Sequence, residues 1–185
     1  QIRSRPGFDW RKVQDIKVFI NSQGNQAVGS PLAIRRAPGN VVQAQFSICY
    51  NIACALVNGK VGLDDFTPEA LSRPDMLACA ALVTPMIDAE FERPMGRDVT
   101  PARVEVQVGD VWLVAQVTEA KGNFATPMSA ADHRAKLVDC LVAGGFDPAT
   151  ADAFEYVMER LPGSADVGTD LRGLSRKLAL TELRK

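Results

Sequence analysis

The sequence has few of the residues on which most catalytic and metal sites depend. It contains a single histidine, His133, and it has no HExxH motif, no GxSxG motif and no phosphate-binding glycine loop. These absences exclude the common zinc-protease, serine-hydrolase and nucleotide-binding signatures. His133 lies among charged neighbours at the start of a polar helix, so we expect a solvated surface histidine. The sequence therefore predicts no metal site.

A strong net charge and a long apolar run are also missing. The 21 Lys and Arg residues balance 22 Asp and Glu residues, and the formal net charge is -1. This balance excludes the basic surface of a nucleic-acid-binding protein. The longest apolar candidate, residues 48–57, falls well short of the roughly 18 residues of a membrane span, and Tyr50 and Asn51 interrupt it. We expect neither nucleic acid nor a membrane as a partner.

Cysteine is scarce and shows no paired spacing. The four cysteines lie in apolar, helix-like contexts without a CxxC motif: Cys49, Cys54, Cys79 and Cys140. This pattern is typical of reduced core thiols, and we therefore expect a cytoplasmic protein. The chain begins with Gln1 and shows no targeting segment, which suggests a fragment of a longer protein.

Apolar alternation predicts strands in the first two thirds of the chain. Ile16, Val18 and Ile20 alternate with more polar residues and predict a first strand. Residues 103–108 and 111–118 predict a β-hairpin, because Gly109-Asp110 between them suits a tight turn. The hairpin alternates between valines and polar residues, so we expect one face of the sheet to be covered and the other to face solvent.

Helical spacing predicts the covering layer. Residues 46–57 are apolar nearly all round, which is typical of a buried helix, and Asn58-Gly59 ends it. Further helices are expected to start at Thr67-Pro68 and to cover residues 74–82, 130–143, 149–161 and 171–183, with a strand at residues 86–91. Ser129 with Asp132 resembles a capping box that opens the helix at residues 130–143. Residues 21–45 are rich in Gly, Pro and Asn and predict a long loop.

This order of elements predicts an α+β fold. We expect a two-layer α/β sandwich over residues 1–120, with a mostly antiparallel sheet and helices on one face. Residues 121–185 carry only helical patterns and are expected to form a separate C-terminal helical segment.

Two polar sites are candidates for chemistry. Ser47, Tyr50 and Asn51 are spaced three and four residues apart, so they share one face at the start of the buried helix. A helix N-terminus favours a bound carboxylate or phosphate. The alternative is structural: Ser47 caps the helix, and Tyr50 is a core aromatic residue. Lys121, in the corner after the last strand, is either a binding cation or a solvated loop lysine.

Three segments together resemble the MmgE/PrpD family. Residues 45–59 read QFSICYNIACALVNG and follow the family run FS-x-x-Y-x-x-A-x-A-L-x-x-G, while residues 10–20 resemble its first strand. Residues 121–136 read KGNFATPMSAADHRAK and resemble its KG-x-P-x-N-P-M segment. The sequence departs from the pattern at Phe124, where the family usually has Pro, and at Cys49.

The resemblance implies a function for the parent protein. Members such as 2-methylcitrate dehydratase and cis-aconitate decarboxylase act on small di- or tricarboxylic acids, without a cofactor. The resemblance implies that residues 1–120 are the lid domain and that residues 121–185 return to a helical domain outside this chain. It also implies that Tyr50 reaches the cleft, with Ser47 at the cleft-facing start of the helix. Asn51 at the same helix start and Lys121 in the polar corner are further substrate-binding candidates from their positions alone. We expect a homodimeric lyase or epimerase whose fragment alone is inactive.

Two other hypotheses stay open. The first is a non-catalytic small-molecule-binding or dimerisation module whose sheet face pairs with a second copy, because the residues present include no acid–base pair. The second is a relative of the family that has lost its activity.

Overall fold

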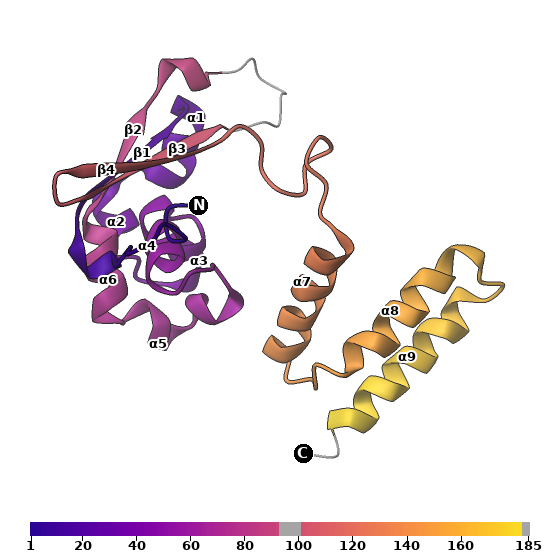
Figure 1. The fold of residues 1–185 in the computed structure, drawn as a ribbon. Coiled ribbons are helices and arrows are strands. Elements are labelled where there is room, and N and C mark those ends of the chain that lie inside the picture. Colours follow the sequence, from indigo (N-terminus) through magenta and orange to yellow (C-terminus); the bar gives the residue numbers. More distant parts are fainter. Residues whose placement is uncertain (93–100, 183–185) are drawn as a thin grey trace. The chain divides into compact units, whose positions relative to one another are not determined.

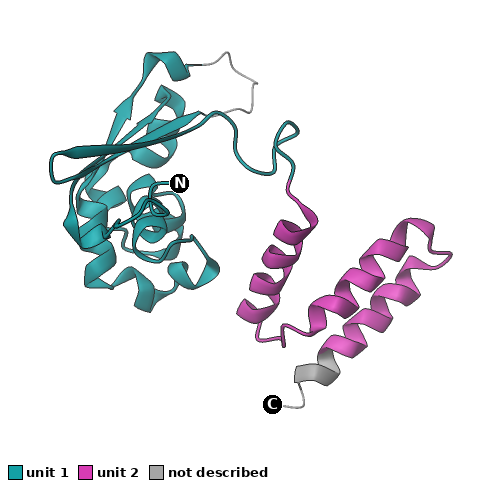
Figure 2. Ribbon diagram, in the orientation of Figure 1, with its two compact units in different colours: residues 1–127 teal, residues 128–185 magenta. Residues whose placement is uncertain are grey.

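The computed structural model describes residues 1–92 and 101–182. The chain divides into two compact units, residues 1–127 and residues 128–185 (Figure 2). The sequence predicted a boundary after residue 120. The later division is consistent with hydrogen bonds that fold residues 120–126 back on themselves: Gly122 N–H donates to Thr126 O (2.7 Å), and the Thr126 hydroxyl donates to Ala120 O (2.7 Å).

A four-stranded mixed sheet forms one layer of the first unit. Its strands are β1 (Val13–Ile20), β2 (Val83–Ile87), β3 (Ala102–Val108) and β4 (Val111–Val117), in the order β2-β1-β3-β4. β1 pairs parallel with β2 and antiparallel with β3, and β3 pairs antiparallel with β4. The α+β class, the mostly antiparallel sheet and the hairpin are therefore confirmed.

Helices form the other layer of this unit. The helical segments of the whole unit, including short turns at the ends of strands, are in chain order η1 (Trp10–Lys12), α1 (Ser22–Gly24), the π-helix η2 (Asn25–Gly29), α2 (Leu32–Arg36), α3 (Val41–Gln45), α4 (Ile48–Val57), η3 (Leu63–Phe66), α5 (Pro68–Leu71), α6 (Pro74–Ala81) and η4 (Ala89–Phe91). Figure 1 shows α4 and α6 on the same side of the sheet.

The core lies between the sheet and these helices. Ile16 and Val18 of β1, Val106 of β3 and Cys49 and Ala53 of α4 are all buried in one cluster. Lys17 and Glu105 pair with each other and alternate with these core residues, so they lie on the opposite face of the sheet. The sequence predicted that this face is not covered by helices. The predicted alternation is confirmed from Ile16 to Ile20, where every second residue is buried, and a register shift after Val13 interrupts it before that.

The long loop predicted at residues 21–45 is wrong, since this segment contains four short helical pieces. Asn21 and Asn40 cap two of them: their side-chain oxygens accept hydrogen bonds from Gly24 N–H (2.7 Å) and Gln43 N–H (2.9 Å). Helices of three to five residues leave no apolar periodicity in the sequence, and Asn suits both caps and loops.

The strand predicted at residues 86–91 begins earlier and ends earlier, as β2. Val83 is buried and pairs with Ile16 of the neighbouring strand β1, which fixes the start of the strand. Asp88 ends it, because its carboxylate accepts the Glu90 N–H (3.0 Å) and caps the turn η4.

The second unit consists of α7 (Ala130–Ala143), α8 (Thr150–Arg160), η5 (Leu161–Gly163) and α9 (Val167–Glu182). The predicted capping box is confirmed at α7, where Ser129 and Asp132 exchange hydrogen bonds between side chain and backbone (3.0 and 3.2 Å). α9 begins four residues before its predicted start at residue 171, and its predicted end at residue 183 lies outside the described residues. None of the described helices combines the length and the apolar character that crossing a bilayer requires.

Candidate functional site

The start of α4 is fixed by Ser47. Its backbone is extended (φ -110°, ψ 112°), and its hydroxyl accepts the Tyr50 N–H (3.0 Å), which is the geometry of an N-cap. The same hydroxyl donates to the carbonyl oxygen of Arg35 in α2. Ser47 has no exposed surface. Its side chain therefore joins α2 to α4, and in this arrangement its donor and its acceptor are both occupied.

Tyr50 lies inside the first unit with none of its surface exposed. Its hydroxyl donates to the carbonyl oxygen of Asp65 (2.8 Å), and its ring lies 6.3 Å from the ring of Phe66 between centroids. Burial, followed by the nearby Cys54 and Asp65, raises the pKa of Tyr50 to about 12. The phenol is therefore a protonated donor at neutral pH, and the Asp65 carbonyl is its acceptor.

Asn51 and Lys121 have different surroundings. The half-buried Asn51 amide donates to the carbonyl oxygens of Ser47 (2.7 Å) and Ala44 (3.0 Å), which closes the corner between α3 and α4. Lys121 is exposed in the turn that follows β4. The structure thus brings Ser47, Tyr50 and Asn51 together at one helix start, as the spacing predicted, and places Lys121 in a separate segment. His133 is exposed on α7, as expected.

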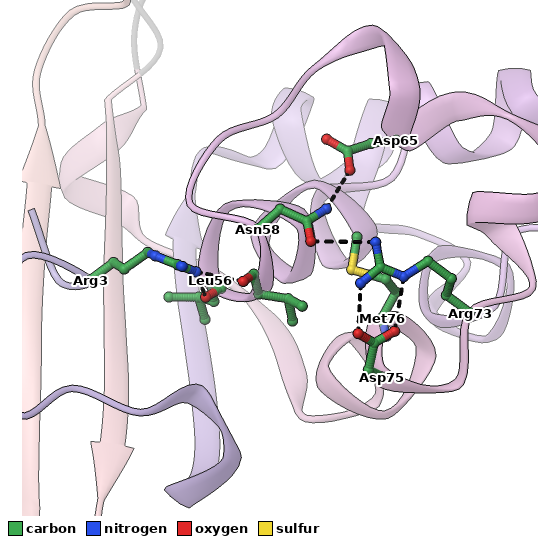
Figure 3. A network of polar contacts seen from close by, with 8 residues as sticks. Arg3, Leu56, Asn58, Asp65, Arg73, Asp75 and Met76 are labelled. Atoms are coloured by element: carbon green, nitrogen blue, oxygen red, sulfur yellow. Dashed lines mark hydrogen bonds and ion pairs between the residues drawn. The ribbon is translucent and has the colours of Figure 1, made fainter.

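A polar network beyond the end of α4 was not predicted from the sequence (Figure 3). The carboxylate of Asp65 accepts hydrogen bonds from the Asn58 amide (2.6 Å) and from Gly62 N–H (2.8 Å). The guanidinium of Arg73 donates to Asn58 Oδ1 (3.4 Å) and binds Asp75 through two nitrogens (3.1 and 2.6 Å). The hydrogen bond from Arg73 lowers the pKa of Asp75. The only local signal was the spacing of Gly62 and Asp65, which suits a capped turn.

Three of the cysteines are buried thiols, as predicted. Cys49, Cys54 and Cys79 are free and have no exposed surface, and burial raises their pKa values to about 11, 12 and 11. The prediction of a core position is wrong for Cys140, which is exposed because α7 turns the adjacent Leu141 inward instead. Within residues 1–92 and 101–182, no three His, Cys, Asp or Glu side chains gather as a metal site.

Replacing Tyr50 by Phe tests how much its hydroxyl stabilises the fold. Tyr50→Phe leaves the buried Asp65 carbonyl without its donor, so we expect the free energy of unfolding to fall by about 1–3 kcal/mol. Urea unfolding followed by circular dichroism measures this change. Tyr156→Phe is the matched control, because Tyr156 is 58% exposed, and its loss should stay below about 0.5 kcal/mol. Equal losses in the two variants would contradict the assignment.

A known protein family matches most of the chain. A family model described as the MmgE/PrpD C-terminal domain matches residues 1–161, which include the whole first unit and α7 and α8. No curated protein sequence matches the chain.

Proposed function

This chain belongs to the MmgE/PrpD family, matching its C-terminal domain, and from that membership we propose that it is part of a lyase or epimerase acting on a small di- or tricarboxylic acid. The reaction class is removal of a proton alpha to a carboxylate, with loss of water or carbon dioxide or with epimerisation, and without a cofactor. The family match over residues 1–161 is the observation that carries this proposal.

The residues of this chain support a binding role more than a proton-transfer role. Tyr50 offers a phenol that stays protonated at neutral pH, which suits a hydrogen bond to a carboxylate and not a general base. Single donors of this kind orient a substrate while a base elsewhere removes the proton. We assign the base to a domain outside this chain, and we keep Ser47, Asn51 and Lys121 as weaker substrate-binding candidates.

Turnover of citrate-like and aconitate-like acids by the full-length protein tests the proposal. We expect Tyr50→Phe to lower kcat by roughly 100–1,000-fold, since a donor aimed at developing charge is worth that range. Val83→Ala is the control, because Val83 is buried at the start of the edge strand β2 and its loss lowers stability without touching the phenol. Unchanged kcat in Tyr50→Phe would remove Tyr50 from the site, and no turnover of any such acid would remove the enzyme proposal.

One observation favours the alternative of an association module. The outer face of the sheet exposes Met86 (41%), Trp112 (37%) and Val114 (45%), and Lys17 lies 4.6 Å from the centre of the Trp112 ring. Trp and Met are enriched in protein interfaces relative to the rest of the surface. Analytical ultracentrifugation of wild type and Trp112→Ala distinguishes the two functions, since a dimer lost in the variant, together with no carboxylate binding, would favour association.

A further inference from the structure

Residues 59–66, which we call the cover segment, lie over the hydroxyl of Tyr50. Within the described residues the phenol donates to Asp65 of this segment, and the neighbouring Phe66 lies beside the Tyr50 ring. If Tyr50 is to bind a substrate, its hydroxyl must leave the Asp65 carbonyl. The contacts that hold the cover segment in place therefore decide whether Tyr50 is accessible.

Asp65 makes the polar contacts that fasten the cover segment to α4. Its carbonyl oxygen accepts from the Tyr50 hydroxyl (2.8 Å), and its carboxylate accepts from the amide of Asn58 (2.6 Å), the C-cap residue of α4. The carboxylate also accepts from Gly62 N–H (2.8 Å), which holds the turn in shape. One residue thus both shapes the cover segment and attaches it to the helix.

The cover segment has the properties of a part that can move without unfolding the core. Val61 and Leu63 are 45% and 48% exposed, so Phe66 is the main apolar side chain that the segment packs against the core around Tyr50. Gly59 has a φ of 87°, which only glycine adopts easily, and gives the segment a pivot at its start. Segments with few buried apolar contacts open at a lower free energy than the core does.

We propose that the cover segment is a displaceable latch over Tyr50, fastened by Asp65, and that a substrate carboxylate replaces the Asp65 carbonyl as acceptor of the Tyr50 hydroxyl. A carboxylate forms a shorter and stronger hydrogen bond than a neutral carbonyl, so the exchange favours the ligand-bound, open form. The carboxylate in this inference rests on the proposed function. The latch itself rests on the contacts of Asp65.

Nitration of Tyr50 at near-neutral pH, measured by peptide mass spectrometry, tests the latch. Nitration consumes the tyrosinate form, and a fall of the Tyr50 pKa from about 12 to its ordinary value of 10.0 would increase that form roughly 100-fold. We expect Asp65→Ala to nitrate Tyr50 at least roughly 10-fold faster than wild type does. Tyr156 is the internal standard, and Asp64→Ala, at an exposed neighbouring position, should leave the Tyr50 rate unchanged.

A folded Asp65→Ala variant whose Tyr50 rate stays within about twofold of wild type would overturn the latch. If Asp65→Ala does not fold, amide hydrogen exchange in the wild-type protein tests instead whether the cover segment opens separately from α4. The Asp65 amide, bonded to Gly62 O (3.2 Å), should exchange about 100-fold faster than the Asn51 amide, bonded to Ser47 O (3.0 Å) in α4. Equal exchange rates would show that the cover segment opens only with the core.

The ligand step is tested separately with citrate on the full-length protein carrying Asp65→Ala. We expect citrate to slow the nitration of Tyr50, while sodium chloride at equal ionic strength does not. Faster nitration in the variant without protection by citrate would keep the latch and reject the carboxylate as its ligand. Protection of Tyr50 by citrate in Asp65→Ala, together with citrate binding by calorimetry that Asp65→Ala shows and Asp65→Ala/Tyr50→Phe loses, would support both.

Discussion

Raising the pH above about 9 is expected to unfold the first unit, with a midpoint at about pH 10–12. Cys49, Cys54 and Cys79 have an ordinary thiol pKa of 9.0, and burial raises their pKa values to about 11, 12 and 11. Tyr50 adds a rise from 10.0 to about 12. In the unfolded chain these groups lose their protons first, so the equilibrium shifts toward unfolding as the pH rises.

The sign and the size follow from proton linkage. Below pH 9 the thiols are protonated in both states, and their contribution to stability is fully present; it is lost as the pH rises through the folded-state pKa values of about 11–12. Between about pH 9 and 11, where the thiols are ionised in the unfolded chain and protonated in the fold, each lowers the free energy of unfolding by about 1.4 kcal/mol per pH unit, so three lower it by about 4 kcal/mol per pH unit. Domains typically have a free energy of unfolding of about 5–15 kcal/mol, so a rise of about two to three pH units at this slope removes most or all of it.

Urea unfolding at several pH values, followed by tryptophan fluorescence, measures the slope. The chain has two tryptophans, Trp10 and Trp112, and both belong to the first unit. We expect Cys54→Ala to reduce the slope above pH 9 by about 1.4 kcal/mol per pH unit, whatever constant loss its smaller side chain causes. Cys140→Ala is the matched control because Cys140 is exposed, and its slope should equal that of wild type. A flat stability profile between about pH 9 and 11 would contradict the prediction.

Replacing Ile16 by Ala is expected to have the largest effect of any single change in the sheet. Ile16 lies at the sheet centre with Val83 and Val106 as its register partners, and none of the three has exposed surface. Removing three carbons here loses their transfer free energy and leaves a cavity that the surrounding strands cannot fill. The expected loss in the free energy of unfolding is about 2–5 kcal/mol.

Val114→Ala provides the comparison for Ile16→Ala. Val114 is also a β-branched residue in the sheet, but it faces outward and is 45% exposed, so we expect its loss to stay within about 0.5 kcal/mol. Tryptophan fluorescence in urea reports both variants through the same probes. A loss below about 1 kcal/mol for Ile16→Ala would show that the core closes around the gap.

The parts of the fold that the sequence predicted are those with a regular local signal. The alternation of Ile16, Val18 and Ile20 predicted β1 because one face of the strand is buried, and Ser129 with Asp132 predicted the start of α7 because a capping box is a contact between near neighbours. The helices between residues 21 and 45 were missed, since segments this short are held by capping asparagines and by packing and show no period.

The candidate site was predicted in position but not in contacts. The spacing of Ser47, Tyr50 and Asn51 placed them on one helix start, and the structure agrees. The sequence could not show that the Tyr50 hydroxyl meets the carbonyl of Asp65, fifteen residues away, because that contact depends on the path of the intervening chain. Any residue can offer a backbone carbonyl, so no residue type marks such a partner.

The first residues of the chain have a consequence for anyone who trims or tags the protein. The guanidinium of Arg3 donates to the last carbonyls of α4, Leu56 O and Val57 O (both 2.6 Å), across more than fifty residues of sequence (Figure 3). A Cβ on Gly59 would lie 2.9 Å from Arg3 Nε, so the arginine also packs against the pivot of the cover segment. Starting the expressed protein after residue 3 would remove a positive charge from the C-terminal end of α4, which carries the negative end of the helix dipole. It would also remove the contact between Arg3 and Gly59 at the start of the cover segment.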